Sequence, residues 1–383
     1  MRIGLTTHTF PPEFIGGREM HVEALARALS KDDDIIIFAG SNVKRVIKED
    51  MGGYTLYKIP AFPITLSKNP LQVYRVVPRF YSVLSKEKLD IIHAHEYGHF
   101  TTDIASLYSK VSKTPLVLTV HGYVIENKIL GITKKLYDRT IGLKTLKAAN
   151  KIIAVSKRQK EDIIRWAGKE IEGENILYVP NGIYINEFND LKFNGESYQG
   201  YNFGNSPLVL GVGRLLPRKG FLYLIEAAKK VVKLDPDVKF VIVGPDGGEM
   251  QNLIQKINEN DLADNFFLLG TVPRNVLRYL YSCANIFVIP SFYEGLPTTL
   301  LEAMACGIPV IGSNIDGIQI VVENDRDGLL IPPGNADILA DKICLLLRDK
   351  ILADKLSRNA KKKVEDYDWK KIHLQIKKIY EQA

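Results

Sequence analysis

Short apolar runs alternate with longer amphipathic stretches along almost the whole chain. This rhythm predicts parallel βαβ units, in which each apolar run is a buried strand and each amphipathic stretch is a crossover helix. In the first half the expected strands are Arg2–Thr7, Ile35–Ala39, Leu89–His93, Leu116–Val120, Lys151–Val155 and Ile176–Val179. The second half repeats the rhythm at Leu208–Gly213, Lys239–Gly244, Phe266–Gly270, Ile286–Pro290, Pro309–Gly312 and Leu329–Ile331. The pattern therefore predicts an α/β protein with two doubly wound parallel sheets.

Helices are expected between these strands. In the first half the amphipathic stretches are Gly17–Ser30, Leu71–Lys86, Thr101–Val111 and Lys128–Ala149. After Asp366, apolar residues recur at helical spacing among lysines. This last pattern predicts an amphipathic C-terminal helix.

The length of the chain, 383 residues, suits two domains better than one hydrophobic core. The segment 186–206 is rich in Gly, Asn and aromatic residues and has no usable period, which is typical of a linker. We therefore expect an N-terminal domain over 1–187, a linker over 188–206 and a C-terminal domain over 207–365. The last helix, 366–383, is expected to pack back on the N-terminal domain, although its pattern alone also allows packing on the C-terminal one.

The composition is that of an ordinary soluble enzyme, with 46% hydrophobic and 25% charged residues. The three cysteines have neither zinc-ligand spacing nor a disulfide framework, which favours a reducing compartment. The first residues turn polar too soon for a signal peptide, and no apolar run approaches the roughly 20 residues that cross a bilayer. We therefore expect a cytoplasmic protein.

The net charge of +7 favours anionic partners such as nucleotides, anionic membranes or nucleic acid without choosing among them. Basic and apolar residues interleave in two stretches, 58–80 and 134–160. Basic side chains near an anionic leaflet gain about 1 kcal/mol each. Peripheral contact with the inner face of a membrane is thus one interpretation, and a solvated helix face is the other. No nucleic-acid partner is expected.

The most informative segment follows the strand expected at Ile286–Pro290 and reads SFYEGLPTTLLEAMACGIPV. Pro297 suits the first position of a helix, where its missing N–H costs nothing. Unpaired backbone N–H groups at such a helix start attract phosphate. Glu294 precedes the helix, and Glu302 lies five residues beyond Pro297, roughly 7.5 Å along the helix.

A nucleotide sugar matches this layout, because it carries ribose hydroxyls, a central diphosphate and sugar hydroxyls in that order. Carboxylates accept hydrogen bonds from hydroxyl groups, so Glu294 and Glu302 can each hold one polyol end. The alternative is that both glutamates are ordinary surface or capping residues.

This segment resembles the E-x7-E motif of the retaining GT-B glycosyltransferases of family 4, and the similarity covers nearly the whole chain. The resemblance implies two Rossmann-like doubly wound domains that face each other across a cleft. It also implies that Glu294 contacts the hydroxyls of the donor sugar and that Glu302 binds the nucleotide ribose. The backbone that faces the sugar and phosphates would be that of Gly295, Leu296, Pro297 and Thr298. The segment Gly270–Pro273, with Val272, would meet the base.

A second cluster opens the second half of the chain and reads GVGRLLPRKG. Arg214 and Lys219 can neutralise a diphosphate there, the arginine as a fork and the lysine as a point charge. Leu216 stands where a dinucleotide fingerprint has its third glycine. The cluster is similar instead to the family pattern G-R-x-x-x-x-K-G, which assigns Gly213, Arg214 and Lys219 to the donor diphosphate. A solvated basic loop is the alternative, and Arg218 has no assigned role.

Near the N-terminus, the loop Phe10–Gly17 joins the first strand to a helix. Gly16 and Gly17 permit close backbone approach at the strand end, and a plain turn is the alternative. In the family this loop closes over the donor phosphate and borders the acceptor site. The resemblance thus makes Gly16 and Gly17 donor contacts, and Arg18 and His21 acceptor contacts.

His121 follows the strand Leu116–Val120, and ligands of open α/β sheets bind beyond the carboxyl ends of the strands. A histidine there is also common as a hydrogen-bonded loop residue. In the family the corresponding histidine lies against the donor sugar, so the resemblance assigns His121 that role.

These features and the family resemblance together predict retaining, metal-independent transfer of a sugar from a nucleotide diphosphate to an acceptor that the sequence does not identify, for which a lipid and a glycan are the candidates. The catalytic residues would be His121, Arg214, Lys219 and Glu294. Fixed cations and the helix start would stabilise the charge that grows on the leaving diphosphate. Neither a metal nor a cofactor is expected, since the nucleotide sugar is a substrate.

Three other functions compete with this prediction. A sugar-nucleotide epimerase could share the fold and would need no acceptor. A dinucleotide-dependent oxidoreductase is disfavoured by Leu216. A non-catalytic basic module that binds membrane or nucleic acid would explain the charge but would leave Glu294 and Glu302 without a purpose.

Overall fold

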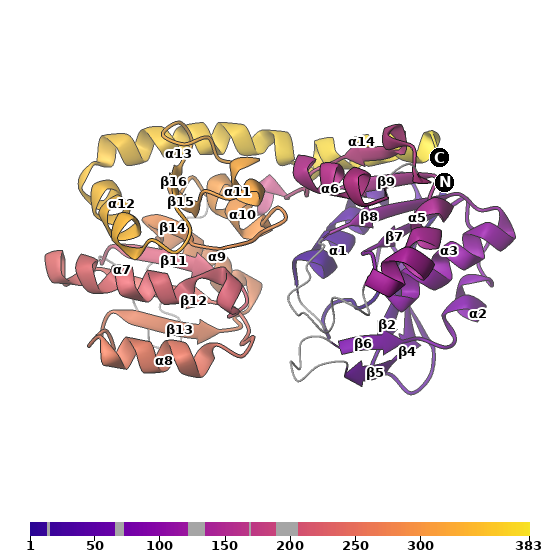
Figure 1. Ribbon diagram of the computed structural model, residues 1–383, viewed down its shortest axis with the longest axis horizontal. Coiled ribbons are helices and arrows are strands. Elements are labelled where there is room, and N and C mark those ends of the chain that lie inside the picture. Colours follow the sequence, from indigo (N-terminus) through magenta and orange to yellow (C-terminus); the bar gives the residue numbers. More distant parts are fainter. Residues whose placement is uncertain (14–15, 66–72, 122–134, 168–169, 189–205) are drawn as a thin grey trace. The chain divides into compact units, whose positions relative to one another are not determined.

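The computed structural model describes residues 1–13, 16–65, 73–121, 135–167, 170–188 and 206–383. These residues form two compact units. Unit 1 combines Met1–Gly182 with Trp369–Ala383, and unit 2 is Ile183–Asp368. Each unit is built on its own, mainly parallel sheet (Figure 1). Among the described helices, none has the length and apolar character that a membrane span requires.

Unit 1 contains an eight-stranded sheet in the order β10-β9-β8-β7-β1-β2-β4-β3. The strands are β1 (Arg2–Thr7), β2 (Asp34–Ser41), β3 (Ile47–Asp50), β4 (Thr55–Pro60), β7 (Ile91–His95), β8 (Leu116–Val120), β9 (Lys151–Ala154) and β10 (Ile176–Tyr178). All neighbouring pairs are parallel except β3 with β4. The chain runs outward from β1 in one direction and then restarts at β7 in the other, which makes the unit doubly wound.

The middle of this sheet is buried on both faces. Every residue of β7 and β8 is buried, and such strands read as near-continuous apolar runs because helices cover both sides. His93 and His95 interrupt the apolar run of β7 and are nevertheless fully buried. The apolar pattern of the sequence does not predict two buried histidines in a central strand.

Helices pack on both faces of the unit 1 sheet. They are α1 (Gly17–Leu29), α2 (Phe80–Leu84), α3 (Phe100–Ser112), α5 (Leu143–Ala148), α6 (Lys157–Ala167) and α14 (Trp369–Glu381). Side chains of α2, α3, α5 and α6 share one apolar core with the sheet, and α1 packs against α14. A π-helical turn at Asp138–Gly142 leads into α5. The predicted helix Lys128–Ala149 lies partly outside the described residues.

The predicted helix Leu71–Lys86 is wrong. Its described part forms β6 (Val73–Val76), which pairs antiparallel with β5 (Phe62–Thr65), and then only the short α2. Pro78 explains the difference, because proline disfavours the helical conformation of the residue before it and lacks the N–H that a helix interior needs.

The prediction of a wholly parallel first sheet also fails at its edge. Strands β3 and β4 form an antiparallel pair there, and neither strand was expected. The two middle residues of β3, Lys48 and Glu49, are charged, and none of its four residues is buried. A charged, exposed edge strand of this kind carries no apolar run that could predict it.

Unit 2 contains a six-stranded parallel sheet in the order β13-β12-β11-β14-β15-β16. The strands are β11 (Leu208–Val212), β12 (Lys239–Val243), β13 (Phe266–Gly270), β14 (Ile286–Ile289), β15 (Val310–Ser313) and β16 (Leu329–Ile331). In sequence order this is 3-2-1-4-5-6, the doubly wound order of a nucleotide-binding fold, and the direction reverses between β11 and β14. All six strands were predicted within two residues.

Two separate cores cover the two faces of this sheet. The helices are α7 (Phe221–Leu234), α8 (Met250–Glu259), α9 (Arg274–Cys283), α10 (Thr298–Ala305), α11 (Asp316–Gln319), α12 (Ala336–Arg348) and α13 (Lys350–Val364). Helices α7, α8 and α12 pack on one face, while α9 and α10 pack on the other. The alternating side chains of β11 divide accordingly, with Val209 in one core and Leu208 and Leu210 in the other.

Helix α14 belongs to unit 1 although the chain reaches it from unit 2. Trp369 is 1% exposed and packs on His21, with ring centroids 5.1 Å apart. The hydroxyl of Tyr380 lies 2.7 Å from Nδ1 of His93. A Cβ added to Gly182 would lie 2.7 Å from the Trp369 ring, so this position needs a glycine to admit the indole.

The two units divide between Gly182 and Ile183, slightly before the boundary expected at residue 187. Ile183, Ile185 and Phe188 join a core of unit 2, which draws this segment to the second unit. Most of the expected linker, residues 189–205, lies outside the described residues.

The burial of Trp369 generates a stability prediction. Trp369→Ala should lower the free energy of unfolding of unit 1 by about 3–5 kcal/mol, because a large buried ring leaves a cavity against His21 and Gly182. Urea unfolding followed by the fluorescence of Trp166, which also lies in unit 1, would measure the change. Leu374→Ala on the same helix is the control: Leu374 is 51% exposed, and its replacement should cost no more than about 0.5 kcal/mol. Equal effects of the two substitutions would contradict this packing.

Candidate functional site

In unit 2, two loops leave the sheet at the place where the strand order reverses. One loop, 213–220, follows β11, and the other, 291–297, follows β14. Open α/β sheets bind ligands at this point, because the crossovers on either side leave the carboxyl ends of the two strands uncovered. The backbone N–H of Phe292 donates to the carbonyl of Arg218 at 2.8 Å. The two loops are therefore tied together.

The first pair of predicted site residues meets here. Nζ of Lys219 donates to Oε1 of Glu294 at 2.6 Å, and the hydroxyl of Ser291 donates to the same oxygen at 2.7 Å. The side chains of Lys219 and Glu294 are 12% and 8% exposed, so this ion pair is poorly solvated. Lys219 packs closely over Gly213, since a Cβ there would come 3.3 Å from Cε of the lysine.

A left-handed glycine sets the position of the lysine. Gly220 has φ of 69°, and a Cβ there would lie 2.1 Å from the carbonyl oxygen of Pro290. Any other residue at 220 would clash with the end of β14 and would also be strained at this φ. The glycine thus closes the loop around Lys219.

Arg214 offers a second cation beside this pair. It is partly buried and makes no side-chain hydrogen bond or ion pair with any described residue. Arg218, by contrast, donates to the carbonyl of Tyr293 at 3.1 Å and lies 3.8 Å from Glu294. Of the three cations of this loop, Arg214 is the one whose donors are available to a phosphorylated ligand.

Helix α10 begins one residue later than expected. Pro297 is the N-cap, with φ of −74° and ψ of 117°, and Thr298 is the first helical residue. The extended ψ of Pro297 excludes it from the helix, so its predicted place at the first helical position is wrong by one. No side chain caps this start, which leaves first-turn N–H groups of the backbone for another acceptor.

The residues between Glu294 and the helix are held from both sides. Leu296 is 5% exposed and its side chain belongs to the core, so only its backbone can meet a ligand. A Cβ on Gly317 would lie 2.2 Å from the carbonyl oxygen of Glu294 and 2.6 Å from that of Gly295. Sequence reasoning missed Gly317, whose close approach fixes this loop from α11.

Glu302 lies in α10 and is buried, 8% exposed. The hydroxyl of Tyr281 donates to Oε2 at 2.8 Å, and Nη1 of Arg274 lies 3.5 Å from Oε1. Burial raises the pKa of Glu302, while Arg274 and Tyr281 oppose that shift. Arg274 also pairs with Glu187 at 3.0 Å. Neither Arg274 nor Tyr281 was predicted, because nothing local in the sequence links them to Glu302. Val272 is partly buried and packs against the hydrophobic core that also contains Tyr281.

In unit 1, six of the seven histidines of the chain gather at the carboxyl ends of β1, β7 and β8. They are His8, His21, His93, His95, His99 and His121. The rings contact one another in a chain of neighbours, for example His93 with His95 at 4.1 Å and His21 with His121 at 4.6 Å between centroids. This is again the place where the strand order of the unit reverses, between β1 and β7.

Burial lowers the pKa of five of these histidines. It lowers that of His21 and that of His93 to about 3, and those of His95, His99 and His121 also lie well below the usual value. These five rings are therefore neutral near pH 7. Nδ1 of His95 lies 3.2 Å from Nε2 of His121, which joins the predicted His121 to a residue that was not predicted. A His-x-His pattern at the end of β7 was the available signal.

Arg18 stands beside the histidines with its guanidinium engaged. It pairs with Glu19 at 2.5 Å and with Glu96 at 3.2 Å, and it lies 3.3 Å from Nε2 of His99. Burial lowers the pKa of Arg18, but the charges of Glu19 and Glu96 outweigh it and the pKa is raised. The structure thus makes Arg18 part of an internal network, and its expected contact with an acceptor stays a prediction.

The loop before α1 is described except for residues 14–15. Gly16 is the N-cap of α1 with an extended backbone, and Gly17 is its first residue. A Cβ on Gly17 would meet nothing within 4 Å. No neighbouring atom of the described residues therefore requires a glycine at position 17. The predicted contact of Gly17 with the donor stays a prediction.

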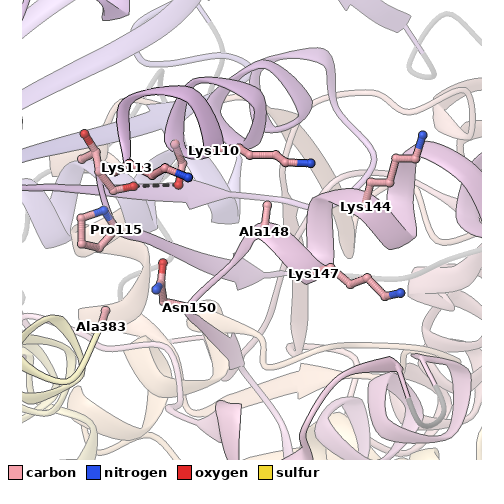
Figure 2. A pocket seen from close by; sticks show the side chains of 10 residues that line it. Lys110, Lys113, Pro115, Lys144, Lys147, Ala148, Asn150 and Ala383 are labelled. Carbon is pink, nitrogen blue, oxygen red and sulfur yellow. Dashed lines mark hydrogen bonds between the residues drawn. The ribbon is translucent and has the colours of Figure 1, made fainter.

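A basic pocket of about 550 Å³ lies at the amino ends of β8 and β9. The histidines gather at the other, carboxyl ends of the strands. Figure 2 shows that Lys110, Lys113, Lys144 and Lys147 line it together with Pro115 and Asn150. None of the predicted catalytic or donor residues lies there. Lys144 and Lys147 come from the second basic stretch of the sequence, whose contact with an anionic membrane stays a prediction.

Comparison with known proteins agrees with this architecture. Two family models match the chain, Glycosyltransferase Family 4 over residues 15–187 and Glycosyl transferases group 1 over residues 196–363. The UDP-Gal:alpha-D-GlcNAc-diphosphoundecaprenol alpha-1,3-galactosyltransferase of Escherichia coli is 32% identical over 295 residues, which are 74% of this chain and 73% of that protein.

Solved structures share the fold at lower identity. Sucrose-phosphate synthase from Thermosynechococcus elongatus matches with a TM-score of 0.79 and 24% identity, over 100% of this chain and 98% of that one. Anabaena HepE in complex with UDP-glucose matches with a TM-score of 0.79 and 20% identity, over 100% of both chains.

The hydrogen bond from Tyr281 to Glu302 generates a prediction. Tyr281→Phe should lower the free energy of unfolding of unit 2 by about 1–3 kcal/mol, because it leaves a buried carboxylate oxygen short of a donor. Urea unfolding followed by circular dichroism would measure this. Tyr223→Phe is the matched control, since the Tyr223 hydroxyl makes no hydrogen bond with the described residues. A loss below about 0.5 kcal/mol for Tyr281→Phe would show that Arg274 alone holds Glu302.

Proposed function

We propose that this chain, which belongs to glycosyltransferase family 4 and has the GT-B fold, transfers a sugar from a nucleotide diphosphate with retention of configuration and without a metal ion. The observation that carries the proposal is the arrangement in unit 2 of an uncapped helix start, a free Arg214 and the buried Lys219–Glu294 pair. Cations and backbone N–H groups are what a diphosphate requires, and a carboxylate next to them is what sugar hydroxyls require.

We assign the donor to the uridine nucleotides. The Escherichia coli relative is named for UDP-Gal, and the Anabaena neighbour was solved with UDP-glucose. In this assignment Glu302 accepts the ribose hydroxyls, and the segment around Val272 meets the base. Gly213 and the backbone from Gly295 to Thr298 contact the diphosphate and the sugar.

The proposed reaction breaks the bond between the anomeric carbon and the diphosphate oxygen and forms a bond from that carbon to the acceptor oxygen. The acceptor proton passes to the leaving diphosphate on the same face of the sugar, which gives retention. Arg214, Lys219 and the start of α10 stabilise the charge that grows on the leaving group, a fixed arrangement that needs no reorganisation during the reaction. His121, neutral because it is buried, contacts the sugar as the family resemblance implies.

We propose a lipid-linked glycan as the acceptor. The acceptor printed in the name of the Escherichia coli relative is a diphosphoundecaprenol carrying GlcNAc, so the reaction would occur at a membrane surface. His21 is the proposed acceptor contact in unit 1. Arg18 would act by fixing Glu96 and His99 in place, since both of its terminal nitrogens are already engaged.

Removing either charge of the donor site should abolish most of the transfer. Lys219→Ala and Glu302→Ala should each lower kcat/KM by about 10²–10³, the usual cost of a group that stabilises transition-state charge or position. Release of UDP from UDP-glucose or UDP-galactose with an extracted lipid-linked acceptor would measure it. Lys230→Ala is the matched control, because Lys230 also pairs with a carboxylate, Asp341 at 2.8 Å, but on the outer part of α7. Full activity of Lys219→Ala would overturn the assignment.

The same assay tests stereochemistry and metal use. Proton magnetic resonance of the fresh product should show the anomeric configuration of the donor. Excess EDTA should leave the rate unchanged, since Arg214 and Lys219 supply the positive charge that a metal ion would otherwise provide. An inverted product or loss of rate with EDTA would refute the corresponding part of the proposal.

The donor base can be tested without any acceptor. UDP should raise the melting temperature more than GDP or ADP at equal concentration, because a ligand at 100 times its Kd adds about 2.7 kcal/mol to the folded state. Arg214→Ala should reduce the UDP shift, since its free guanidinium loses the diphosphate. A larger shift with GDP or ADP would exclude the uridine assignment and leave the family assignment intact.

A further inference from the structure

Three of the clustered histidines of unit 1 converge on one point. His21, His95 and His121 each offer one ring nitrogen, and these three atoms lie within 4.8 Å of one another. They come from three separate elements: α1, the end of β7 and the residue after β8. Three imidazoles that meet in this way are the ligand set of many three-histidine metal sites.

The distance between two of the rings fits shared coordination. Nδ1 of His95 lies 3.2 Å from Nε2 of His121. Two nitrogens bound to one tetrahedral zinc ion at about 2.0–2.1 Å lie about 3.3–3.4 Å apart. The His95–His121 pair therefore already has the spacing of two ligands, and a nitrogen of His21 lies within 4.8 Å of both.

Arg18 is the charged side chain nearest to these rings, and its guanidinium is paired with the carboxylates of Glu19 and Glu96. A divalent ion at the rings would therefore meet a cation that is already compensated and not an unpaired one. Both ring nitrogens of His21 and Nε2 of His95 are buried without a hydrogen-bond partner among the described residues. The rings also have the required chemical form, because imidazole binds metals when it is neutral.

We propose that His21, His95 and His121 bind a divalent transition-metal ion of the zinc or cobalt type, and that this ion inhibits sugar transfer by occupying His121. Nitrogen ligands select such metals over Mg²⁺ and Ca²⁺, which prefer oxygen. The binding part is independent of the proposed function. The inhibition part rests on it, because it requires that His121 contacts the sugar. The proposed transfer needs no metal, so the ion acts as an inhibitor and not as a cofactor.

The binding part is tested on the full chain without donor or acceptor. Co²⁺ added to the EDTA-treated protein should give the visible absorption of a tetrahedral nitrogen site, saturate at one ion per chain, and be displaced by Zn²⁺ but not by Mg²⁺. His95→Gln should abolish this spectrum, because it removes a central ligand. His373→Gln is the matched control, since His373 lies on α14 and its Nδ1 contacts the carbonyl of Trp369 instead. A spectrum that survives His95→Gln, or the absence of saturable binding, would overturn the site.

A second measurement covers the case in which His95→Gln does not fold. X-ray absorption of the zinc-loaded wild-type protein should fit three imidazole ligands, and a fit to one imidazole would refute the triad. The inhibition part is tested by titrating Zn²⁺ into the transfer assay. Activity should fall to about one tenth at ten times the Kd, because only about one eleventh of the enzyme is then free of the ion, and EDTA should restore it. If zinc binds without inhibiting transfer, the metal site is supported and the proposed inhibition is rejected.

Discussion

Both units depend on the same constraint, which is the geometry of a parallel sheet that is wound in two directions. Where the strand order reverses, the two adjacent strands send their crossovers to opposite sides, and their carboxyl ends are left uncovered. In unit 1 this happens between β1 and β7, and in unit 2 between β11 and β14. Polar groups that would be costly elsewhere in the interior are tolerated at these two places. The Lys219–Glu294 pair lies at one of these places, and the histidine cluster lies at the other and extends into β7 as far as His93.

The chemistry of unit 2 is stored in ion pairs that a ligand can exchange. Lys219 pairs with Glu294, and Arg274 pairs with Glu302, so a neighbouring cation compensates each of these two carboxylates. A poorly solvated carboxylate without such a partner would be protonated or would destabilise the fold. In the proposed function, a diphosphate that draws Lys219 toward itself would free an oxygen of Glu294 for the sugar. The ion pair that stabilises the unliganded protein would then couple phosphate binding to sugar binding.

The sequence predicts the central strands well because burial on both faces forces continuous apolar runs, as in β8 and β11. It fails where that force is absent, at the charged edge strand β3 and at β6, where Pro78 breaks a helical pattern. The candidate site shows the same division. Glu294 and Lys219 can be predicted from the sequence because each follows a strand end within a short motif. Arg274, Tyr281 and Gly317 reach the site only through tertiary contacts, and no local pattern marks them.

The clustered histidines of unit 1 form a buried polar group, and most of its rings carry no charge. Burial keeps five of the rings uncharged, so the cluster adds no positive charge next to Arg18. Removing a charged side chain from water requires a partner, and Arg18 has two, Glu19 and Glu96. The two carboxylates therefore compensate the charge of Arg18 next to the rings. Neutral rings with a nitrogen that lacks a hydrogen-bond partner among the described residues, as in His21 and His95, can accept a cation without repulsion from the cluster itself. The same neutral form of the rings is what the proposed contact of His121 with the sugar and the proposed binding of a metal ion both require.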